Sequence, residues 1–563
     1  MAPPPEPALF AAFPDRSRVL LSALGLSGLT DPEAARDFLE RRLGDDNPFR
    51  LAGMAEAVGR IRTAIRDGAS IAVYGDYDAD GVTATALLCD CLTALGAAPL
   101  GFIPHRERDG YGLNTAALTR LADRGVTLVI TVDCGIRAAD EIAEASRLGL
   151  DFIVTDHHAL PEDLPAAVAV INPNRPDCGY GFGDLAGVGL AYKLAQALLR
   201  AARATGEAPP LVESDLLDLV AVGTVADMVP LRGENRALVA QGLVELRRAR
   251  RPGFAAMLRL MDRDPASLDA GGIGFGIGPR LNAAGRMDDA AAALDLLRAP
   301  DFGTALPLAE RLEAQNEARR VALQEALAAA RARIEARGPL PAFLVDASAE
   351  LPLGVVGLVA GRLAEHYRRP AAVLRLEGET ARGSARSIPE LDLIAALDRL
   401  APLLIRHGGH PRAAGFTLAS ADLPRFEAGL LAIAERELAG LDLRAALDIA
   451  AEIEPSDIGW RLQEELEALA PFGEGNRRPV LLWREARVGQ ARTVGADGSH
   501  LKLVLEAGPG LGSVDAIAFG RGADLEGVGS RIDLAFTLDV NTWRGERRLQ
   551  LMVEDLASSG PQG

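Results

Sequence analysis

Between about residues 70 and 230, short apolar runs alternate with helical stretches, and each run ends at a polar or glycine residue. Compact apolar runs of this kind are typical of buried strands, and strands that alternate with helices form a parallel, doubly wound sheet. Such sheets bind their ligands at the carboxyl ends of the strands. We therefore expect an α/β fold whose functional residues follow the runs IAVYG (71–75), TLVITVD (127–133), DFIVTD (151–156) and AVAVIN (167–172).

The first run is followed at once by D-Y-D-A-D-G, which places Asp76, Asp78 and Asp80 at alternate positions. Carboxylates this close repel one another unless a cation neutralises them, so the segment predicts a site for a hard divalent metal. We reject an EF-hand calcium loop, because its twelfth position is Leu87 instead of glutamate and a strand precedes it. Standing alone, the segment could also be a solvated acidic turn.

More acidic residues and two histidines follow the later strands. Asp133 ends TVDCG, the triplet Asp156, His157 and His158 ends IVTDHH, and Asp227 lies in GTVADMVP beyond a helical stretch. Because successive strand ends lie side by side in a parallel sheet, these side chains should meet in one crevice. Aspartate oxygens with one or two imidazoles suit Mn²⁺ or Mg²⁺, whereas zinc more often takes thiolates or more histidines. Each residue alone could be a helix cap or a buried histidine, but their joint placement predicts a metal centre.

The length of 563 residues predicts several domains with separate cores. A long helix rich in Ala, Leu, Glu and Arg follows the first α/β region, and a second α/β region with glycine-rich patches comes next. Short β-like runs near the C-terminus predict a five-stranded barrel such as an OB-fold. We expect a multidomain α/β protein with an N-terminal segment (1–45), a catalytic domain with a parallel doubly wound sheet (46–302), a long connecting helix (303–338), a second α/β domain (339–430), a helical link (431–478) and a C-terminal OB-like β-barrel (479–557).

The formal net charge of −18 argues against a protein that coats nucleic acid indiscriminately, although local arginine clusters could still bind phosphate. The four cysteines form no CxxC pair, so we expect reduced thiols. No apolar stretch approaches the roughly 18 residues that a membrane span needs, and the N-terminus has no export signal. We therefore expect a cytoplasmic protein that does not contact membranes.

Taken in order, GDYDADG, VDCG, TDHH and GTVADMVPL resemble the four motifs of the DHH phosphoesterase superfamily, and GGHPRAAGF resembles its DHHA1 domain. Further stretches, including GPRLNAAGRM (278–287) and PFGEGNRRPVL (471–481), make the chain similar to the bacterial members that degrade single-stranded DNA. The resemblance runs from about residue 45 to the C-terminus. It implies DHH, DHHA1 and OB-fold domains in the three globular regions predicted above.

The resemblance also implies roles for the acidic residues. Asp133 resembles the carboxylate that bridges two metal ions, His158 is placed to contact the phosphate or the leaving group, and Asp156 would orient its neighbours. Tyr74 stands where many smaller phosphatases of the superfamily have a histidine, which leaves the first metal with fewer protein ligands. The expected metal ligands are Asp78, Asp80, Asp133, His157 and Asp227, and the expected catalytic residues are Asp76, Asp133, Asp156 and His158.

Arginines and glycine-rich turns elsewhere suit a terminal phosphate, and an aromatic ring can stack on a base. The expected phosphate- and DNA-binding residues are Arg280, Asn282, Arg286, Ser384, Arg386, Gly409, His410 and Trp543, with Lys502, Arg544, Arg547 and Arg548 of the barrel as further candidates. Trp543 could equally belong to the barrel core, and LRRARR (246–251) could be a strand-binding patch or an exposed basic helix face. The run GGIGFGIG (271–278) lacks the spacing of a dinucleotide site and is predicted to be a flexible lid or linker.

The family resemblance implies a metal-dependent exonuclease that releases 5′-mononucleotides from the 5′ end of single-stranded DNA, in recombination and repair, with two Mn²⁺ or Mg²⁺ ions. Its expected partners are single-stranded DNA with a 5′ end, the single-strand-binding protein and a RecQ-type helicase, and we expect a monomer. The alternative is a phosphodiesterase of the superfamily that acts on short oligonucleotides or cyclic dinucleotides, which the length and the terminal barrel oppose. The sequence argues against a catalytically silent scaffold, because each of the five expected metal-ligand positions holds an aspartate or a histidine.

Overall fold

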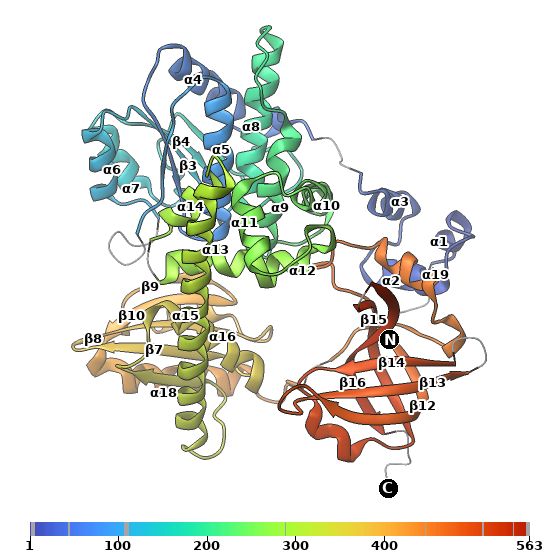
Figure 1. The fold of residues 1–563 in the computed structure, drawn as a ribbon. Helices are drawn as coiled ribbons and strands as arrows, with labels where there is room; N and C mark the ends of the chain where they lie inside the picture. The colour runs from blue at the N-terminus through green and yellow to red at the C-terminus, as the bar shows by residue number, and fades with distance from the viewer. Residues whose placement is uncertain are drawn as a thin grey trace.

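The computed structural model describes residues 1, 6–42, 46–105, 112–287, 289–444, 446–508, 512–543 and 545–558. Figure 1 shows an α/β domain at the top, a second α/β domain below it, and a barrel beside the second domain. The long helix α15 (Phe302–Glu335) runs from the first domain into the second. No helix within the described ranges has both the length and the apolar character that a membrane span requires.

The first domain is built on a parallel five-stranded sheet in the order β2-β1-β3-β4-β5. Alternate side chains face two cores: Ile71 and Val73 pack on one side of the sheet, and Ala72 and Tyr74 on the other. The four strands predicted here are confirmed, and the strand order reverses between β1 and β3, where doubly wound sheets bind ligands. The strands are β1 (Ile71–Gly75), β2 (Leu100–Phe102), β3 (Leu128–Val132), β4 (Asp151–Thr155) and β5 (Ala169–Ile171). One face of the sheet is covered by α4 (Met54–Arg66), α5 (Ala79–Ala94) and α8 (Gly187–Ala204). The other face is covered by α6 (Thr115–Asp123) and α7 (Ala139–Ser146).

The helices that follow the sheet are α9 (Leu217–Ala226), α10 (Gly233–Arg247), α11 (Pro252–Leu260), α12 (Ala270–Gly272), α13 (Gly278–Met287) and α14 (Ala291–Leu297). The prediction of a flexible lid or linker at 271–278 is wrong, because this run forms α12, a π-helix over Ile273–Ile277 and the start of α13. A Cβ at Gly276 would lie 2.4 Å from Met261 Cε, and one at Gly278 would lie 3.2 Å from Ala226 Cβ. These glycines therefore permit close helix packing.

The second domain contains a five-stranded mixed sheet in the order β6-β7-β8-β10-β9. Its two glycine-rich patches lie largely within strands: a Cβ at Gly383 would come within 2.5 Å of the ring of Phe416, so the small residue lets the ring pack on the sheet. The elements are β6 (Leu344–Ser348), α16 (Val356–Tyr367), β7 (Ala371–Glu377), β8 (Thr380–Arg386), α17 (Leu393–Arg399), β9 (Leu404–His410), β10 (Ala413–Ala419) and α18 (Leu423–Glu437). Helices α15 and α16 pack on one face, and α17 and α18 on the other.

In the third body, pairing of β12 with β15 closes five strands into the predicted OB-like barrel, and β11 (Ile449–Glu452) adds to β12 in parallel. The barrel strands are β12 (Val480–Val494), β13 (His500–Gly508), β14 (Gly512–Ala518), β15 (Arg531–Trp543) and β16 (Glu546–Ser558). The N-terminal segment forms three helices, α1 (Pro7–Ala12), α2 (Arg18–Leu26) and α3 (Pro32–Glu40). These helices and α19 (Trp460–Glu467) pack into the same hydrophobic core as the barrel strands. Ser17 N donates to Glu465 Oε2 at 3.0 Å, so the two ends of the chain fold together.

Candidate active site

The three aspartates of the first motif lie at the carboxyl end of β1. Asp78 caps α5, since its Oδ1 accepts hydrogen bonds from the N–H groups of Asp80 (3.1 Å) and Gly81 (3.0 Å). A Cβ at Gly81 would lie 2.5 Å from backbone atoms of Asp76, so only glycine fits there. The motif therefore gathers its carboxylates at a helix N-terminus, where negative charge is favourable.

Asp133 follows β3 with a φ of 62°, in the left-handed region that residues other than glycine rarely adopt. Its N–H donates to the carbonyl of Thr155 at 3.0 Å, and its side chain is buried. A Cβ at Gly187 would lie 2.5 Å from Asp133 Cβ, so the start of α8 lies directly against this aspartate. A buried carboxylate on a strained backbone at a strand end is typical of functional sites.

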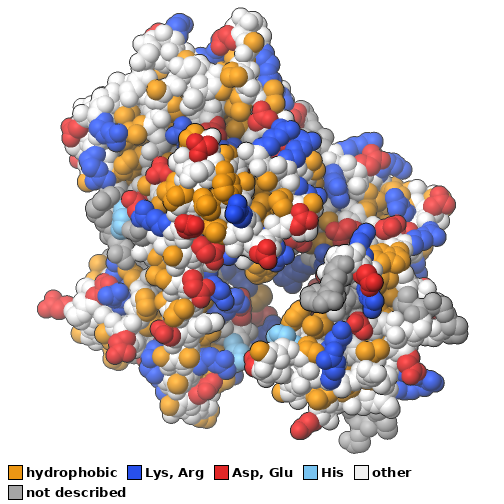
Figure 2. Space-filling model, in the orientation of Figure 1, with side chains coloured by type: hydrophobic (Ala, Val, Ile, Leu, Met, Phe, Trp, Pro, Cys, Tyr) orange, Lys and Arg blue, Asp and Glu red, His pale blue; other side chains and the backbone are white. Residues whose placement is uncertain are grey.

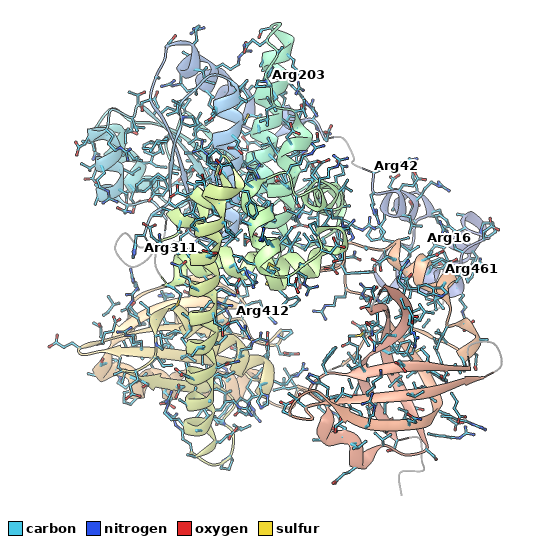
Figure 3. All side chains as sticks on the ribbon, in the orientation of Figure 1. Arg16, Arg42, Arg203, Arg311, Arg412 and Arg461 are labelled. Atoms are coloured by element: carbon cyan, nitrogen blue, oxygen red, sulfur yellow. The ribbon has the colours of Figure 1, made fainter. Side chains whose placement is uncertain are left out.

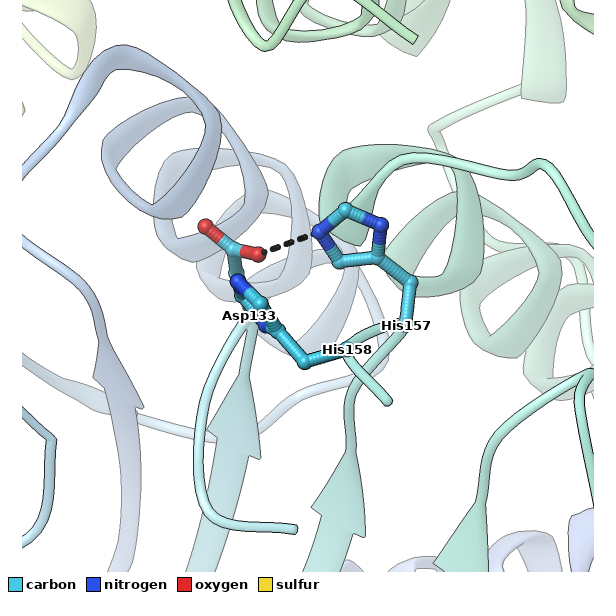
Figure 4. Close-up of side chains that lie close together, drawn as sticks. All are labelled: Asp133, His157 and His158. Atoms are coloured by element: carbon cyan, nitrogen blue, oxygen red, sulfur yellow. Dashed lines mark ion pairs between the residues drawn. The ribbon is translucent and has the colours of Figure 1, made fainter. Parts of the chain in front are cut away.

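The ring of His157 faces two carboxylates. Its Nε2 lies 3.1 Å from Asp133 Oδ1 (Figure 4) and 3.6 Å from Asp227 Oδ2. Asp227 is the C-cap of α9, and the next residue, Met228, also has a left-handed backbone with a φ of 64°. Within the part of the chain that the structure describes, neither His157 Nε2 nor Asp133 Oδ1 has a hydrogen-bond partner, although both atoms are buried.

The potential ligand atoms form three overlapping groups, and the atoms of each group lie within 4.8 Å of one another. Asp133 and His157 each belong to two of the groups, so the groups share one location. The structure thus brings together all five expected metal ligands. The groups are Asp76, Asp78 and Asp133; Asp80, His157 and Asp227; and Asp133, His157 and His158.

The electrostatics of this cluster are unfavourable without a cation. Burial raises the pKa of Asp80 and of Asp133 well above the usual range, and repulsion from neighbouring aspartates raises both further. Burial and the charge of Asp78 raise the pKa of Asp227 to about 7. Burial and the neighbouring His158 lower the pKa of His157 to about 4, so this ring is neutral near pH 7 and cannot offset the carboxylates.

A divalent cation fits this set of donors. Asp133 Oδ1 and His157 Nε2 are buried without hydrogen-bond partners among the described residues, and a positive charge between them would satisfy both atoms and relieve the repulsion. The thiol of Cys134 points elsewhere, lying 3.7 Å from the Tyr74 carbonyl oxygen, and burial raises its pKa, so it stays protonated. Oxygen and imidazole donors without thiolate favour Mn²⁺ or Mg²⁺ over zinc.

His158 is held by Asp156. Its Nδ1 lies 2.7 Å from Asp156 Oδ1, and Asp156 also accepts from the N–H groups of His158 and Ile136, each at 3.0 Å. Burial opposes a charge on this ring, but the hydrogen bond to Asp156 raises the pKa of His158 to about 9. The ring of His410, at the end of β9, stacks on it with centroids 6.2 Å apart and planes 7° apart. The two α/β domains therefore meet at this site.

Several expected phosphate-binding residues lie on β8 and β9 of the second domain. On β8, Arg386 Nη1 donates to Ser384 Oγ at 3.0 Å. A Cβ at Gly357, near the start of α16, would lie 3.0 Å from Ser384 Oγ and 3.3 Å from Arg386 Nη2. Gly409 directly precedes His410 on β9, and Arg412, in the following turn, lies at the edge of the second domain below the first (Figure 3). Arg386 and His410 both lie opposite Ala413 of β10 in the sheet, and His410 makes the contact with His158 of the first domain.

Two more of the expected phosphate-binding residues, Asn282 and Arg280, lie on α13 and make contacts within the protein. Asn282 Oδ1 accepts from the N–H of Ala79 at 2.8 Å and so holds the acidic loop in place. Arg280 is bonded through Nη2 to Glu313 Oε1 at 3.0 Å, with a second bond from Nε to the same carboxylate, and through Nη1 to the Gly276 carbonyl at 2.9 Å. Two of the five N–H donors of this guanidinium are therefore already bonded to Glu313.

Arg286, also on α13, lies close to the second domain, since a Cβ at Gly354 would come within 2.4 Å of the Arg286 carbonyl oxygen. In the barrel, Lys502 pairs with Asp515 at 2.8 Å and Arg548 with Glu546 at 2.7 Å. Arg547 lies over the ring of Trp460, 5.3 Å from its centroid. The side chain of Trp543 and the whole of Arg544 lie outside the described residues.

The run 246–251 is divided, since Arg247, Arg248 and Arg250 are exposed, as in a basic helix face, whereas Arg251 turns inward. Arg247 donates to the Leu268 carbonyl at 2.8 Å, and Arg248 pairs with Glu245 at 2.6 Å. Arg251 is largely buried between Asp90 and Asp218, 2.9 Å from each. The sequence pattern shows only the arginines, whereas the acidic partners of Arg251 come from distant helices.

Sequence reasoning missed two sets of residues that support the site. The N–H groups of Gly187 and Val188, at the start of α8, donate to the Asp80 carboxylate at 2.7 and 2.8 Å. Asn172, after β5, donates to the carbonyl of His158 at 2.9 Å, and Asn174 donates to that of His157 at 3.3 Å. The available signals were the polar NPN (172–174) at the end of a predicted strand and the AGVG (186–189) at a helix start.

Comparison with known proteins agrees with this architecture. Models of the DHH family N-terminal domain, the DHHA1 domain and the RecJ OB domain match residues 70–224, 341–436 and 449–555. The single-stranded-DNA-specific exonuclease RecJ of Bacillus subtilis is 38% identical over 546 residues, which cover 96% of this chain and 68% of that protein. Crystal structures of RecJ from Thermus thermophilus in complex with Mn²⁺ and with Mg²⁺ superpose with TM-scores of 0.84 and 0.78, at 30% and 29% identity, covering 99% of this chain and 79% and 78% of those chains.

A parallel sheet with acidic strand ends, joined by a long helix to a DHHA1 domain, defines a phosphoesterase of the DHH superfamily. The match extends through the OB domain and over nearly the whole chain. The chain belongs to the RecJ family of single-stranded-DNA-specific exonucleases.

Proposed function

We propose that this protein is a metal-dependent exonuclease that degrades single-stranded DNA from its 5′ end to 5′-mononucleotides, in recombination and repair. The observation that carries the proposal is the convergence of four aspartates and one neutral histidine on a single location, within a chain of the RecJ family. The proposed cofactors are two Mn²⁺ or Mg²⁺ ions, because RecJ from Thermus thermophilus has been solved in complex with each metal and the donor atoms here suit both.

We propose that Asp78, Asp80, Asp133, His157 and Asp227 would hold the metal ions, and that Asp133 would be shared between them, as the family resemblance implies. When bound, the ions activate a water molecule and offset the charge that builds on the phosphate. The protein contributes fixed geometry: Asp80 is held by Gly187 and Val188, and the strained backbone of Asp133 keeps its carboxylate at the strand end. No nucleophilic serine or cysteine is required.

His158 is proposed to bind the scissile phosphate or the leaving group. Its Nδ1 is occupied by Asp156, so the opposite ring nitrogen, Nε2, is the one oriented to donate a proton or a hydrogen bond to a phosphate oxygen. His410 stacks on the same ring, so a residue of the second domain lies beside the proposed reaction centre. With Ser384, Arg386 and Gly409 it forms the proposed binding site for the 5′ end of the strand.

The three bodies leave an opening between them, with Lys and Arg side chains along its upper rim (Figure 2). We propose that one DNA strand passes through this opening. A duplex is wider than a single strand, and we propose that the opening does not admit it. A basic channel also reconciles strand binding with the net charge of −18, since only the channel needs to be positive.

The finer assignments rest on the family resemblance alone. We propose that the chain works as a monomer in the cytoplasm, where its DNA substrate is found, and that the single-strand-binding protein and a RecQ-type helicase cooperate with it. The limits of the DHH domain (46–302), the DHHA1 domain (339–430) and the OB-fold domain (479–557) are proposed on the same basis.

The test is release of nucleotides from strands labelled at the 5′ or the 3′ end, with Mn²⁺, Mg²⁺ or EDTA. The proposal expects metal-dependent release of the 5′ label first, as mononucleotides. Activity in EDTA, or degradation from the 3′ end, would contradict it. Faster turnover of a dinucleotide than of a long strand would favour a phosphodiesterase of short substrates.

A further inference from the structure

The segment after Asp227 joins the proposed metal centre to the barrel. Leu231 N donates to the Glu474 carbonyl at 2.7 Å, and Arg232 Nε donates to the Gly475 carbonyl at 2.7 Å. Both acceptors belong to the turn 473–476, which lies between α19 and the first barrel strand, β12. The loop that carries a proposed metal ligand is thus hydrogen-bonded to the base of another domain.

The fit between this loop and the turn is close. A Cβ at Gly473 would lie 2.7 Å from Leu231 Cδ1, and one at Gly475 would lie 2.9 Å from Pro230 Cβ. Gly475 also has a φ of 68°, which glycine adopts readily. Leu231 is buried, so the loop cannot shift without disturbing packed atoms.

Arg236, in the first turns of α10, is buried at the same junction and binds backbone carbonyls on its far side. It is 2% exposed, and its guanidinium donates to the carbonyls of Ala468, Leu469 and Ala470 at 3.0, 3.3 and 2.8 Å. It also bonds the carbonyl of Phe38 and lies over that ring, 3.6 Å from the centroid. This one cation binds the ends of α19 and α3, so the barrel, the N-terminal helices and the first domain meet around α10.

A second connection leads from the loop to the remaining ligands. Asn235, which is fully buried, donates through Nδ2 to the carbonyls of Pro230 at 3.1 Å and Asp184 at 2.5 Å. The segment after Asp184 begins α8, whose Gly187 both donates to Asp80 and lies against Asp133. The contacts therefore form a continuous network from the turn 473–476 to three proposed metal ligands.

We propose that the turn 473–476 positions the metal ligands, with Arg232 and Asn235 as positioning residues, so that the placement of the barrel sets how tightly the centre holds Mn²⁺. The inference rests on the proposed metal role of Asp227. It gives the barrel a function besides strand binding. A change in the position of the barrel relative to the first domain would move Leu231 and Arg232, and through them Asp227. Outer residues that orient metal ligands typically change metal affinity by about 10–100-fold when removed.

The experiment compares two glycine substitutions in the full chain. Gly475→Ala places a Cβ against Pro230, whereas Gly520→Ala, in the barrel, sits at a similar φ of 71° with no atom within 4 Å. Both variants carry the same left-handed strain, and only the first disturbs the junction. We expect Mn²⁺ affinity, measured from the EPR signal of the free ion, to fall about 10-fold or more in Gly475→Ala and to stay unchanged in Gly520→Ala.

Arg232→Met is the gentler variant, since this side chain is exposed and its loss removes one hydrogen bond without a clash. We expect it to weaken Mn²⁺ binding in the same direction and to lower kcat more than it raises KM for the strand. Unchanged Mn²⁺ affinity in both Gly475→Ala and Arg232→Met overturns the inference, as does an equal loss in Gly520→Ala.

Asp227→Asn separates this inference from the proposed function. If Asp227→Asn leaves Mn²⁺ binding intact, the proposed metal centre itself is wrong. If Asp227→Asn weakens Mn²⁺ binding while Gly475→Ala and Arg232→Met do not, the centre stands and only the role of the turn is refuted.

Discussion

Helix α5 contributes an aspartate near each end, each belonging to a cluster of acidic side chains, and the two clusters differ in how their charge is balanced. At its start, Asp80 joins the aspartates around Asp133, and the imidazole that faces them, His157, is neutral near pH 7. Toward its end, Asp90 and the buried Asp218 share Arg251, each with a contact of 2.9 Å. In the second cluster an arginine of the protein balances the negative charge, whereas in the first the carboxylates need a bound cation to balance theirs.

The pKa shifts express the same contrast. Burial raises the pKa of Asp133, and the charges of the four neighbouring aspartates raise it further. Burial also raises the pKa of Asp218, but there Arg251 opposes the rise. Buried carboxylates paired with an arginine serve the fold, and those left to repel one another mark a site for a ligand. Four predictions test this distinction.

The largest effect is expected from Asp133→Asn. Removing the central charge should weaken metal binding and cost several kcal/mol of transition-state stabilisation, or about 10³-fold or more in turnover. Strand binding in EDTA should change by less than about twofold, because the cationic residues remain. Single-turnover hydrolysis and fluorescence anisotropy measure the two quantities. Turnover close to that of the parent would remove Asp133 from the reaction.

Arg251→Met should act on the fold instead. It leaves the buried Asp218 without its cation and removes one of the two arginines that pair with Asp90, which should cost about 3–5 kcal/mol. Scanning calorimetry of the full chain should show a clear fall in melting temperature, and Mn²⁺ affinity in the folded protein should be retained. Arg320→Met, which breaks an exposed pair with Glu317, is the control and should cost at most about 1 kcal/mol. Equal stability of the two variants would refute the contrast.

Asp156→Asn should produce a smaller loss of turnover, about 10–100-fold, because His158 loses the partner that orients its ring. Strand affinity should change little. Asp151→Asn is the matched control, since Asp151 begins the same strand, β4, and pairs with Arg60 at its distant end. If both variants slow the reaction equally in single-turnover assays, the role of Asp156 is structural.

The smallest effect concerns stability without metal. The pKa of Asp227 is raised to about 7, so above that pH its ionised carboxylate destabilises the folded state, and the penalty fades as the pH falls toward the unfolded value. At pH 8 in EDTA, Asp227→Asn should therefore stabilise the protein by about 1–2 kcal/mol. Mn²⁺ should raise the melting temperature of the parent more than that of the variant. A variant that melts lower than the parent in EDTA would contradict the repulsion.

Much of the site could be predicted from local patterns. Runs such as IAVYG identify buried strands, and the residue after each run must lie at one edge of a parallel sheet. That rule alone places Asp76, Asp133 and Asp156 together. The glycine-rich run 271–278 was misread because a pattern rich in glycine does not distinguish a flexible segment from helices packed too closely for a Cβ.

The amino-acid order by itself determined the sheet, the acidic strand ends and the family, because these depend on spacing over a few residues. Only the tertiary structure decided that His410 stacks on His158, that Glu313 occupies Arg280, and that the N-terminal helices share a core with the barrel. It also decided that Arg236 binds carbonyls more than 200 residues away. Such contacts follow from how whole surfaces pack, and no short pattern records which distant segment will fill a given space.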